Sequence, residues 1–444
     1  MEQTRSQTAH LKRLAELCTS DKKYIDSFLD NPEKILKESK LRLDVEKAKN
    51  FVEMKFLGTR KLNSNEYLDL LKQSYQIKYK DLMERITAED HLDLNFRHWY
   101  DRQKNLNLFC SAMSRQRIKD KSMYFPPVAF ELTKGCSGGC PFCCFDPQSL
   151  EGYFSYDGEN VDLWNSVLIR TKNLLGNSAS TGPCYYGTEP FDNPDYEKFL
   201  NHFYQVFEGY PQTTTVKAIE DVNRTKNLLR MLGEDHLKYS SVRFSVISKK
   251  HLEKIHQLFT PEELILIELI LNNPESLTSY TLAGRAVRLK DKLPDKSFLP
   301  NFSSACVIGF VVNMVQHTVS LVSPRATEVG IKTYETVIFT DGESYENALY
   351  MLINKWMKDD IELDKKISNN NIKFEYDGDY LIIRGDEIHR KVSISEKEYQ
   401  SFMLVLEGQA LGEVFEGLHF TEHERRGLLE LMQFMYDKGY IDIN

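Results

Sequence analysis

The sequence predicts an α/β protein: a partial, TIM-like (β/α)6 barrel with a helical region before it and a winged-helix unit after it. Between Pro126 and about Pro324, short β-branched and aromatic runs alternate with helical patterns, which is typical of βαβ units around a parallel sheet. The end of the chain instead shows strands, three helices and a closing strand. The predicted domains are therefore residues 1–125, 126–360 and 361–444.

Composition narrows the class of protein. The 444 residues carry a net charge of -8, which argues against broad nucleic-acid binding because that needs a basic surface. No run approaches ~18 apolar residues and the N-terminus has no apolar segment, so we expect neither a membrane span nor a signal peptide. Without an export signal, the eight cysteines indicate cytoplasmic thiols available for metal or redox chemistry.

The first ~125 residues predict a small helical bundle. Asn31-Pro32 fits an N-cap followed by proline at the first helical position, and it opens a helix over Glu33 to Ser39. Asp44 is a suitable cap for a further helix that runs through Val52.

The central region supplies the strands and helices of the barrel. The predicted strands are Val128–Thr133, Gly182–Tyr186, Thr213–Ile219, Val242–Ile247, Ile265–Ile270 and Ala305–Asn313. The predicted helices are Val161–Leu175, Pro194–Phe207, Val222–Leu232 and Lys249–Gln257. In such folds the chemistry gathers at the carboxyl ends of the strands, and a loop with four cysteines directly follows the first strand.

The last region predicts a winged helix. Asp377-Gly378 and Gly385-Asp386 are hairpin signals, and Ser395 with Glu398 and Thr421 with Glu424 are capping boxes. Gly439 is a natural helix stop before a short strand over Tyr440–Ile443. Residues 372–444 hold 8 Lys+Arg against 15 Asp+Glu, so we expect peptide binding at a sheet edge rather than DNA binding.

Three cysteines carry the strongest chemical signal. Cys136, Cys140 and Cys143 form a C-x-x-x-C-x-x-C pattern in which Gly138 and Gly139 let the backbone wind closely. Structural zinc uses four ligands, usually as two separated pairs, and no second pair follows. Three thiolates on a short loop suit an iron–sulfur cube with one iron open for catalysis. We read the neighbouring Cys144 as a supporting thiol rather than a ligand. The alternative is a structural metal loop or a set of buried thiols.

This pattern, with Phe142 before the third cysteine, resembles the signature of the radical S-adenosylmethionine (SAM) superfamily. The resemblance implies a partial barrel of radical SAM type, one [4Fe–4S] cluster whose open iron chelates SAM, and Phe142 against the adenine. Gly187-Thr188-Glu189-Pro190 looks like the family's GGEP element, which binds the SAM amino group, although Thr188 replaces a glycine. Arg243 and Ser245 on the fourth strand either reach the SAM ribose or carboxylate or form an ordinary salt bridge and hydroxyl contact.

A narrower resemblance covers about 200 residues between Phe125 and Arg325. It rests on the runs Pro126–Leu132, Asp192–Tyr196, Pro211–Thr215, Arg243–Val246, Ala283–Ala286 and Ser304–Phe310. These look like the proteusin-type radical SAM epimerases, which convert L- to D-residues in ribosomally made precursor peptides. The winged helix is similar to the precursor-recognition element of peptide-maturation enzymes, so we expect it to bind the leader of the precursor.

The resemblance implies that an adenosyl radical removes a peptide Cα hydrogen and that a thiol returns one from the opposite face. Cys18 and Cys110 lie in helical segments and are best explained as packing residues. Cys306, on the sixth strand, is our preferred hydrogen donor, and Cys184, on the second, is the other candidate. Burial as a small hydrophobe is the alternative for either thiol.

Two other functions stay open. A radical SAM enzyme that builds thioether or carbon crosslinks in peptides is the nearest, but such enzymes often carry extra clusters, and no cysteine follows Cys306. A non-catalytic metal-containing peptide-binding protein is the more distant one. The enzyme interpretations imply a flavodoxin- or ferredoxin-type electron donor.

Overall fold

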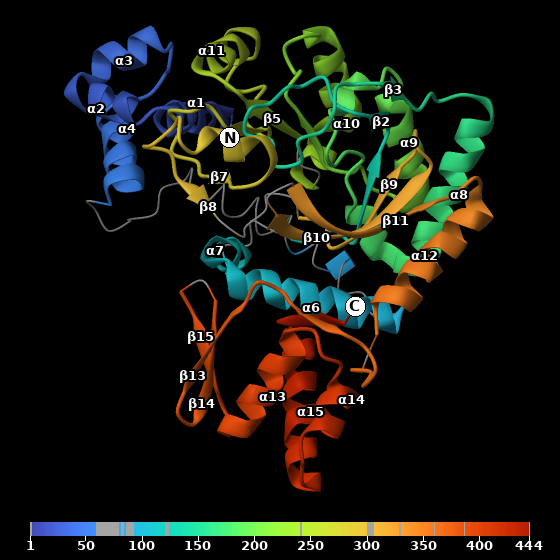
Figure 1. The fold of residues 1–444 in the computed structure, drawn as a ribbon. Helices are drawn as coiled ribbons and strands as arrows, with labels where there is room; N and C mark the ends of the chain where they lie inside the picture. Colours follow the sequence, from blue (N-terminus) through green and yellow to red (C-terminus); the bar gives the residue numbers. More distant parts are fainter. Residues whose placement is uncertain are drawn as a thin grey trace.

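The computed structural model describes residues 2–58, 80, 84–85, 93–119, 124–239, 242–299, 306–327, 330–358, 360–385 and 387–443. It is a mixed α/β protein in which a central unit lies between N-terminal helices and a smaller C-terminal unit (Figure 1). None of the described helices is long and apolar enough to cross a membrane.

The helices of the first 57 residues pack around a small apolar core of their own. Asn31 and Asp44 cap their helices with side-chain oxygens, as the sequence predicts. The elements of this region are α1 (Glu2–Ser20), α2 (Lys22–Asp30), α3 (Pro32–Glu38), α4 (Val45–Val52), the π-helix η1 (Glu53–Leu57), α6 (Leu94–Cys110) and α7 (Ala112–Lys119).

The central unit alternates strands and helices before it turns antiparallel. Its first half contains β1 (Val128–Glu131), β2 (Thr133–Lys134), β3 (Gly152–Tyr153), α8 (Gly158–Leu175), the 3-10 helices η3 (Gly176–Thr181) and η4 (Pro190–Asp192), α9 (Tyr196–Phe207), β4 (Thr213–Thr215) and α10 (Val222–Tyr239, broken at Gly233). Its second half contains β5 (Val242–Val246), α11 (Lys249–Leu258), β6 (Glu268–Leu271), β7 (Tyr280–Thr281), the 3-10 helix η5 (Gly284–Leu289), β8 (Phe298–Leu299), β9 (Gly309–Asn313), β10 (Thr318–Thr327), β11 (Gly330–Ile338) and α12 (Gly342–Trp356).

Two parallel pieces of sheet form the frame of the central unit. Strands β4, β5 and β6 pair in parallel, and β1 pairs in parallel with β9, to which β10 and β11 add antiparallel. One face of each piece is apolar and covered by helices; Phe130, for example, meets Trp164 of α8 edge to face at 5.2 Å. The opposite face is more polar and carries Glu131 on β1 and Arg243 and Ser245 on β5.

The predicted strand at Gly182–Tyr186 is wrong. This segment is irregular and makes one sheet-like bond, from Phe130 N–H to the carbonyl of Pro183 at 2.9 Å. Pro183 has no N–H to donate to a neighbouring strand. Gly182 lies so close to β1 that a side chain on it would collide with the carbonyl of Val128. The segment therefore does not continue a regular ladder of backbone hydrogen bonds. Within the described residues, β1 and β4 therefore belong to separate sheets. The partial barrel stays a prediction.

Other predicted strands are shorter in the structure. The third ends at Thr215 because the next amide, of Val216, bonds a carboxylate instead of a neighbouring strand. The fifth begins at Glu268 because the preceding residues form turns after α11. The sixth begins at Gly309, and Ala305 at its predicted start lies outside the described residues.

The C-terminal unit has its own apolar core. Both predicted capping boxes form, at Ser395 with Glu398 and at Thr421 with Glu424, and Asp377-Gly378 makes the predicted turn; Asp386 of the other turn signal lies outside the described residues. The elements are β12 (Ile367–Asn369), β13 (Lys373–Asp377), β14 (Tyr380–Arg384), β15 (His389–Ser393), α13 (Glu396–Leu406), α14 (Leu411–Gly417), α15 (Glu422–Asp437) and β16 (Ile441–Ile443). The winged-helix assignment and the domain boundaries stay predictions.

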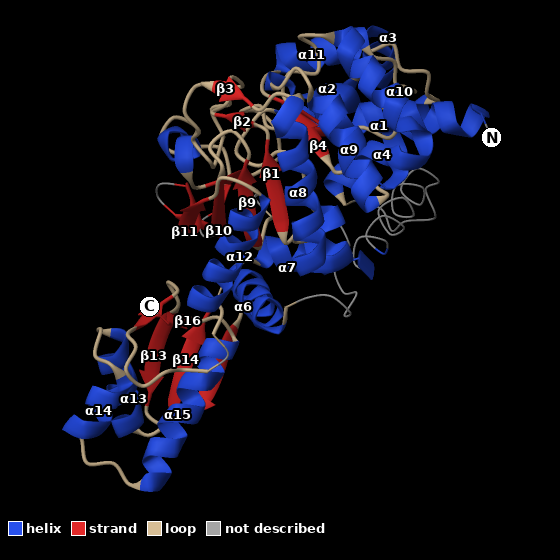
Figure 2. Ribbon diagram, turned by 90° about the vertical axis from the view of Figure 1, so that its right-hand side faces the viewer, coloured by secondary structure: helices blue, strands red, loops and turns tan. Residues whose placement is uncertain are grey.

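Helix α6 joins the central and C-terminal units, and Figure 2 shows it between them. Its first half packs into the central core through Phe96 and Trp99, and its second half into the C-terminal core through Leu106 and Phe109. Arg102, midway, is 1% exposed and donates to the carbonyls of Tyr436 and Ile441 and to Asp442. A helix predicted to belong to the N-terminal bundle therefore supplies a buried face to each of two other cores.

Candidate functional site

The cysteine loop is set between two short strands. Strands β2 and β3 pair antiparallel, so the chain leaves the sheet at Lys134 and returns at Gly152. The amide of Cys136 donates to the carbonyl of Gln148 at 2.9 Å, which draws the two ends of the loop together. All three predicted ligands, Cys136, Cys140 and Cys143, are partly exposed on this loop.

Gly138 packs closely against two of the thiols. A Cβ placed on it would lie 3.4 Å from Cys136 Sγ, 3.8 Å from Cys140 Sγ and 3.0 Å from a methyl group of Val216. Its amide also donates to Cys136 Sγ at 3.3 Å. Burial raises the pKa of Cys136 to about 11 and that of Cys140 to about 12. Metal binding here must therefore release protons from thiols that are protonated at neutral pH.

Helix η5 supports the other end of the loop. Its residue Arg285 donates its backbone N–H to the carbonyl of Cys143 at 2.9 Å and its guanidinium to Asp146 at 2.6 Å. Gly284, with φ +53°, approaches so closely that a Cβ would lie 2.8 Å from the Cys143 carbonyl oxygen. The Ala283–Ala286 run therefore shapes the cysteine loop.

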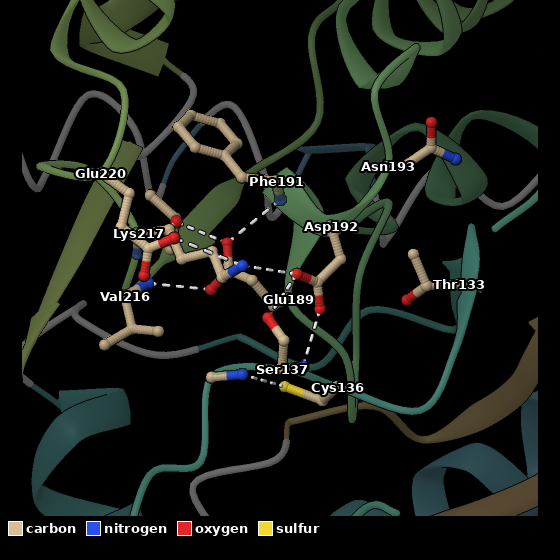
Figure 3. A network of polar contacts seen from close by, with 12 residues as sticks. Thr133, Cys136, Ser137, Glu189, Phe191, Asp192, Asn193, Val216, Lys217 and Glu220 are labelled. Atoms are coloured by element: carbon tan, nitrogen blue, oxygen red, sulfur yellow. Dashed lines mark hydrogen bonds and ion pairs between the residues drawn. The ribbon is translucent and has the colours of Figure 1, made fainter. Parts of the chain in front are cut away.

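Glu189 of the Gly187–Pro190 element is almost fully buried beside this loop (Figure 3). Its carboxylate accepts from the amides of Phe191 at 3.1 Å and Val216 at 2.9 Å and from the hydroxyl of Thr215 at 2.5 Å. Burial outweighs these bonds and raises the pKa of Glu189 to about 7. Pro190 is buried and opens η4, and Thr188 is partly exposed.

Glu131, the last residue of β1, is a partly buried carboxyl that we did not predict as a site residue. It accepts from the amide of Gly187 at 2.8 Å and from the side chain of Asn313 at 3.0 Å. Burial raises its pKa. Its place near the end of the predicted strand Val128–Thr133 was the available signal, because strand ends carry the chemistry in such folds.

Five side chains lie near one another in what we call the interior cluster: Tyr124, Tyr185, Tyr186, Arg243 and Cys306. Arg243 donates to the hydroxyls of Thr214 and Tyr185, each at 2.9 Å. Tyr124 and Cys306 also pack against the central apolar core. Among the described residues, neighbouring hydroxyl groups therefore anchor Arg243.

Tyr186 connects the interior cluster to the cysteine loop. It lies near Cys306 and Cys144, and its ring meets that of Phe145 edge to face at 4.5 Å. Its hydroxyl oxygen is buried and has no hydrogen-bond partner within the described part of the chain. A donor in such a place is available to a bound molecule.

The remaining predicted site residues are less closely involved. Cys184 is 1% exposed in the central core, where burial raises its pKa. The ring of Phe142 lies 5.8 Å from that of Tyr280, and Ser245 is partly exposed on β5.

The donor set fits an iron–sulfur cube held by three ligands, because three partly exposed thiols share a loop in which Gly138 leaves room beside two sulfur atoms. Among the described residues, no group of three His, Cys, Asp or Glu side chains is already arranged to hold a metal ion.

No family model matches the sequence. A protein of Sinorhizobium fredii (strain NBRC 101917 / NGR234), named "Uncharacterized protein y4wI", is 33% identical over 323 residues, which cover 68% of this chain and 59% of that protein. The chain thus spans less than two thirds of the length of this relative. The crystal structure of BtrN in complex with AdoMet and 2-DOIA matches over 44% of this chain and 72% of its own, with 13% identity and a TM-score of 0.28, an overlap too small to support an argument.

Proposed function

We propose that this protein is a radical SAM enzyme with one [4Fe–4S] cluster on Cys136, Cys140 and Cys143. One observation carries the proposal: the cysteine loop lies beside the Gly187–Pro190 element, because Ser137 bonds Asp192 just after Pro190 and a Cβ on Gly187 would lie 3.4 Å from Phe145 Cβ. The nearest residues of the two motifs, Cys143 and Gly187, are 44 residues apart in sequence, and their combination at one place is what SAM binding next to a cluster requires.

The chain's own residues would each have a defined task. The three thiolates hold the cluster, Phe142 and the Gly187–Pro190 element line the SAM site, and Glu131 fixes the Gly187 amide. When bound, the cluster and SAM supply a 5′-deoxyadenosyl radical that removes a hydrogen atom from the substrate. The apolar packing around Tyr186 keeps water away from this region.

Reconstitution under anaerobic conditions tests the cofactor assignment. We expect about four irons per chain, a reduced-cluster signal that shifts on SAM addition, and release of 5′-deoxyadenosine. The triple variant Cys136→Ala, Cys140→Ala, Cys143→Ala should lose all three. Cys144→Ala is the matched control from the same loop and should keep them. Tetrahedral zinc without SAM cleavage in the wild-type protein would refute the radical SAM assignment.

We further propose that the reaction is epimerisation of L- to D-residues in a ribosomally made precursor peptide, with Cys306 as the hydrogen donor. Cys306 is partly exposed at the edge of the central apolar core and lies near Tyr186, whose ring contacts Phe145 of the cysteine loop. Cys184, by contrast, is buried in the apolar core. A thiol that returns hydrogen must meet the substrate radical, which favours Cys306.

Turnover in D₂O tests the reaction. Because a thiol proton exchanges with water, we expect one deuteron on each inverted Cα when a proteusin-type precursor peptide is the substrate. Cys306→Ala should still cleave SAM but give no D-residue, whereas Cys184→Ala should retain inversion. A product lacking two hydrogens and the solvent label would indicate a crosslinking enzyme. Peptide binding without SAM cleavage would indicate a non-catalytic binding protein.

We propose two partners. The leader of the precursor peptide would bind the C-terminal unit, where the three-stranded sheet β13–β14–β15 has two outer edges and the predicted unit is acidic. The electron would come from a flavodoxin- or ferredoxin-type donor. Titration of the full-length chain with a fluorescently labelled leader tests the first partner, and added nucleic acid should not compete.

A further inference from the structure

We infer that Asp192 is a positioning residue that holds the cysteine loop against the Gly187–Pro190 element. Asp192 ends η4, and its carboxylate accepts two hydrogen bonds from one residue of the loop. The amide of Ser137 donates to Oδ2 at 2.8 Å and the hydroxyl of Ser137 donates to Oδ1 at 2.5 Å (Figure 3). Ser137 follows Cys136 directly, so these two hydrogen bonds are one residue from a predicted cluster ligand.

A third contact fixes the carboxylate itself. Lys217 Nζ lies 2.9 Å from Asp192 Oδ1, and the Asp192 side chain is only 1% exposed. Lys217 follows Thr215 and Val216, which hold Glu189 at the end of β4. Three segments therefore meet at Asp192: the cysteine loop, η4 and the residues after β4.

This arrangement restricts the loop before any cofactor binds. Both donors of Ser137 point to one carboxylate, so the backbone between Cys136 and Gly138 cannot rotate without breaking charge-assisted bonds. The same rotation would break the bond from the Gly138 amide to Cys136 Sγ. Asp192 thereby sets the distance between the first ligand and Glu189; its importance for cluster chemistry rests on the proposed function.

Asp195 offers a matched control three residues later. Its carboxylate also accepts a backbone amide, from Tyr156 at 3.0 Å, and pairs with a lysine, Lys198, at 2.7 Å. Both of its partners lie outside the cysteine loop. Asp192→Asn and Asp195→Asn thus make the same chemical change in one segment, but only Asp192→Asn weakens the hydrogen bonds that Ser137 donates.

The test measures the loop first without and then with the cluster, in the full-length chain. In cluster-free protein, Asp192→Asn should raise the iodoacetamide alkylation rate of Cys136 and Cys140 by about tenfold, because loss of a charge-assisted contact favours local opening. Asp195→Asn should match wild type. After reconstitution, Asp192→Asn should broaden the reduced-cluster spectrum and reduce its shift on SAM addition. Lys217→Arg, which keeps the charge, should retain most of the wild-type behaviour.

The outcomes separate this inference from the proposed function. Wild-type alkylation rates and cluster spectra in Asp192→Asn would overturn the positioning role while leaving the radical SAM assignment intact. Faster alkylation in that variant, in a protein whose wild type assembles no cluster, would support the positioning role and refute the proposed function. If Asp192→Asn does not fold, Ser137→Ala and Lys217→Met must reproduce the faster alkylation, and wild-type rates in both would overturn the inference.

Discussion

Glu189 should make the stability of the cluster-free protein fall as pH rises through the neutral range. Burial raises the pKa of this carboxyl from 4.5 to about 7 in the folded chain. Between these values the folded state binds one more proton than the unfolded state, so the free energy of unfolding decreases with pH. The loss of stability is complete above the pKa of Glu189 in the folded chain and absent below its pKa in the unfolded chain.

The size of the effect follows from the same two values. A shift from 4.5 to about 7 corresponds to about 3 kcal/mol, with a steepest slope of about 1.4 kcal/mol per pH unit. Glu189→Gln removes the titration but turns an amide N–H toward donors such as Val216 N–H. We therefore expect an added loss of about 1–3 kcal/mol that does not change with pH.

Urea unfolding between pH 5 and 8 measures the difference, followed by tryptophan fluorescence. All three tryptophans pack in or against the central core, so the signal reports the unit that contains Glu189. The wild-type curve should fall relative to that of Glu189→Gln as pH rises, and Glu220→Gln, a mostly exposed carboxylate nearby, should follow wild type. Parallel curves for wild type and Glu189→Gln would show that Glu189 does not titrate near neutrality.

Two further changes follow from single contacts. Tyr186→Phe should raise the free energy of unfolding by about 1 kcal/mol, because it removes a buried hydroxyl that has no partner among the described residues. Tyr185→Phe should lower the free energy of unfolding, because the hydroxyl of Tyr185 bonds Thr214 and Arg243. Thermal unfolding compares the two variants, and a loss of stability in Tyr186→Phe would contradict the expectation. Arg102→Met should destabilise the protein by about 3–5 kcal/mol, because it leaves Asp442 buried without its cation; calorimetry measures this, and an unchanged unfolding profile would show that the α6 contact is unimportant.

Local signals in the sequence predicted local structure well. The caps at Asn31, Asp44, Ser395 and Thr421 form as predicted, because a cap depends on residues within one helical turn. The four helices predicted between the strands of the central unit also form, with shifted ends. Strands β10 and β11 were not assigned from the sequence, although β10 pairs antiparallel with the neighbouring β9 and β11 pairs antiparallel with β10.

The candidate site shows the same limit. The cysteine triad and the Gly187–Pro190 element are short motifs and could be found from the sequence. Asp192 could not be assigned a role, because its partner Ser137 is 55 residues away and a lone aspartate after a short motif carries no signal of its own. Glu131 was missed for a similar reason, since its contact with Gly187 spans 56 residues.

These contacts also explain why the sequence motifs indicate the cofactor more clearly than the reaction. Asp192 and Arg285 lie in two of the runs that resemble peptide epimerases, and both hold the cysteine loop rather than line the interior cluster. Motifs of this kind therefore indicate cofactor chemistry, which any radical SAM reaction would share. We propose that the choice between inversion and crosslinking depends on residues that face the substrate, and Cys306 is the proposed hydrogen donor, because a thiol can return a hydrogen atom and an inert side chain cannot. Comparing Cys306→Ala with Asp192→Asn separates the choice of product from the cofactor chemistry. Cys306→Ala should change the product while SAM is still cleaved, and Asp192→Asn should change the cluster before any product forms.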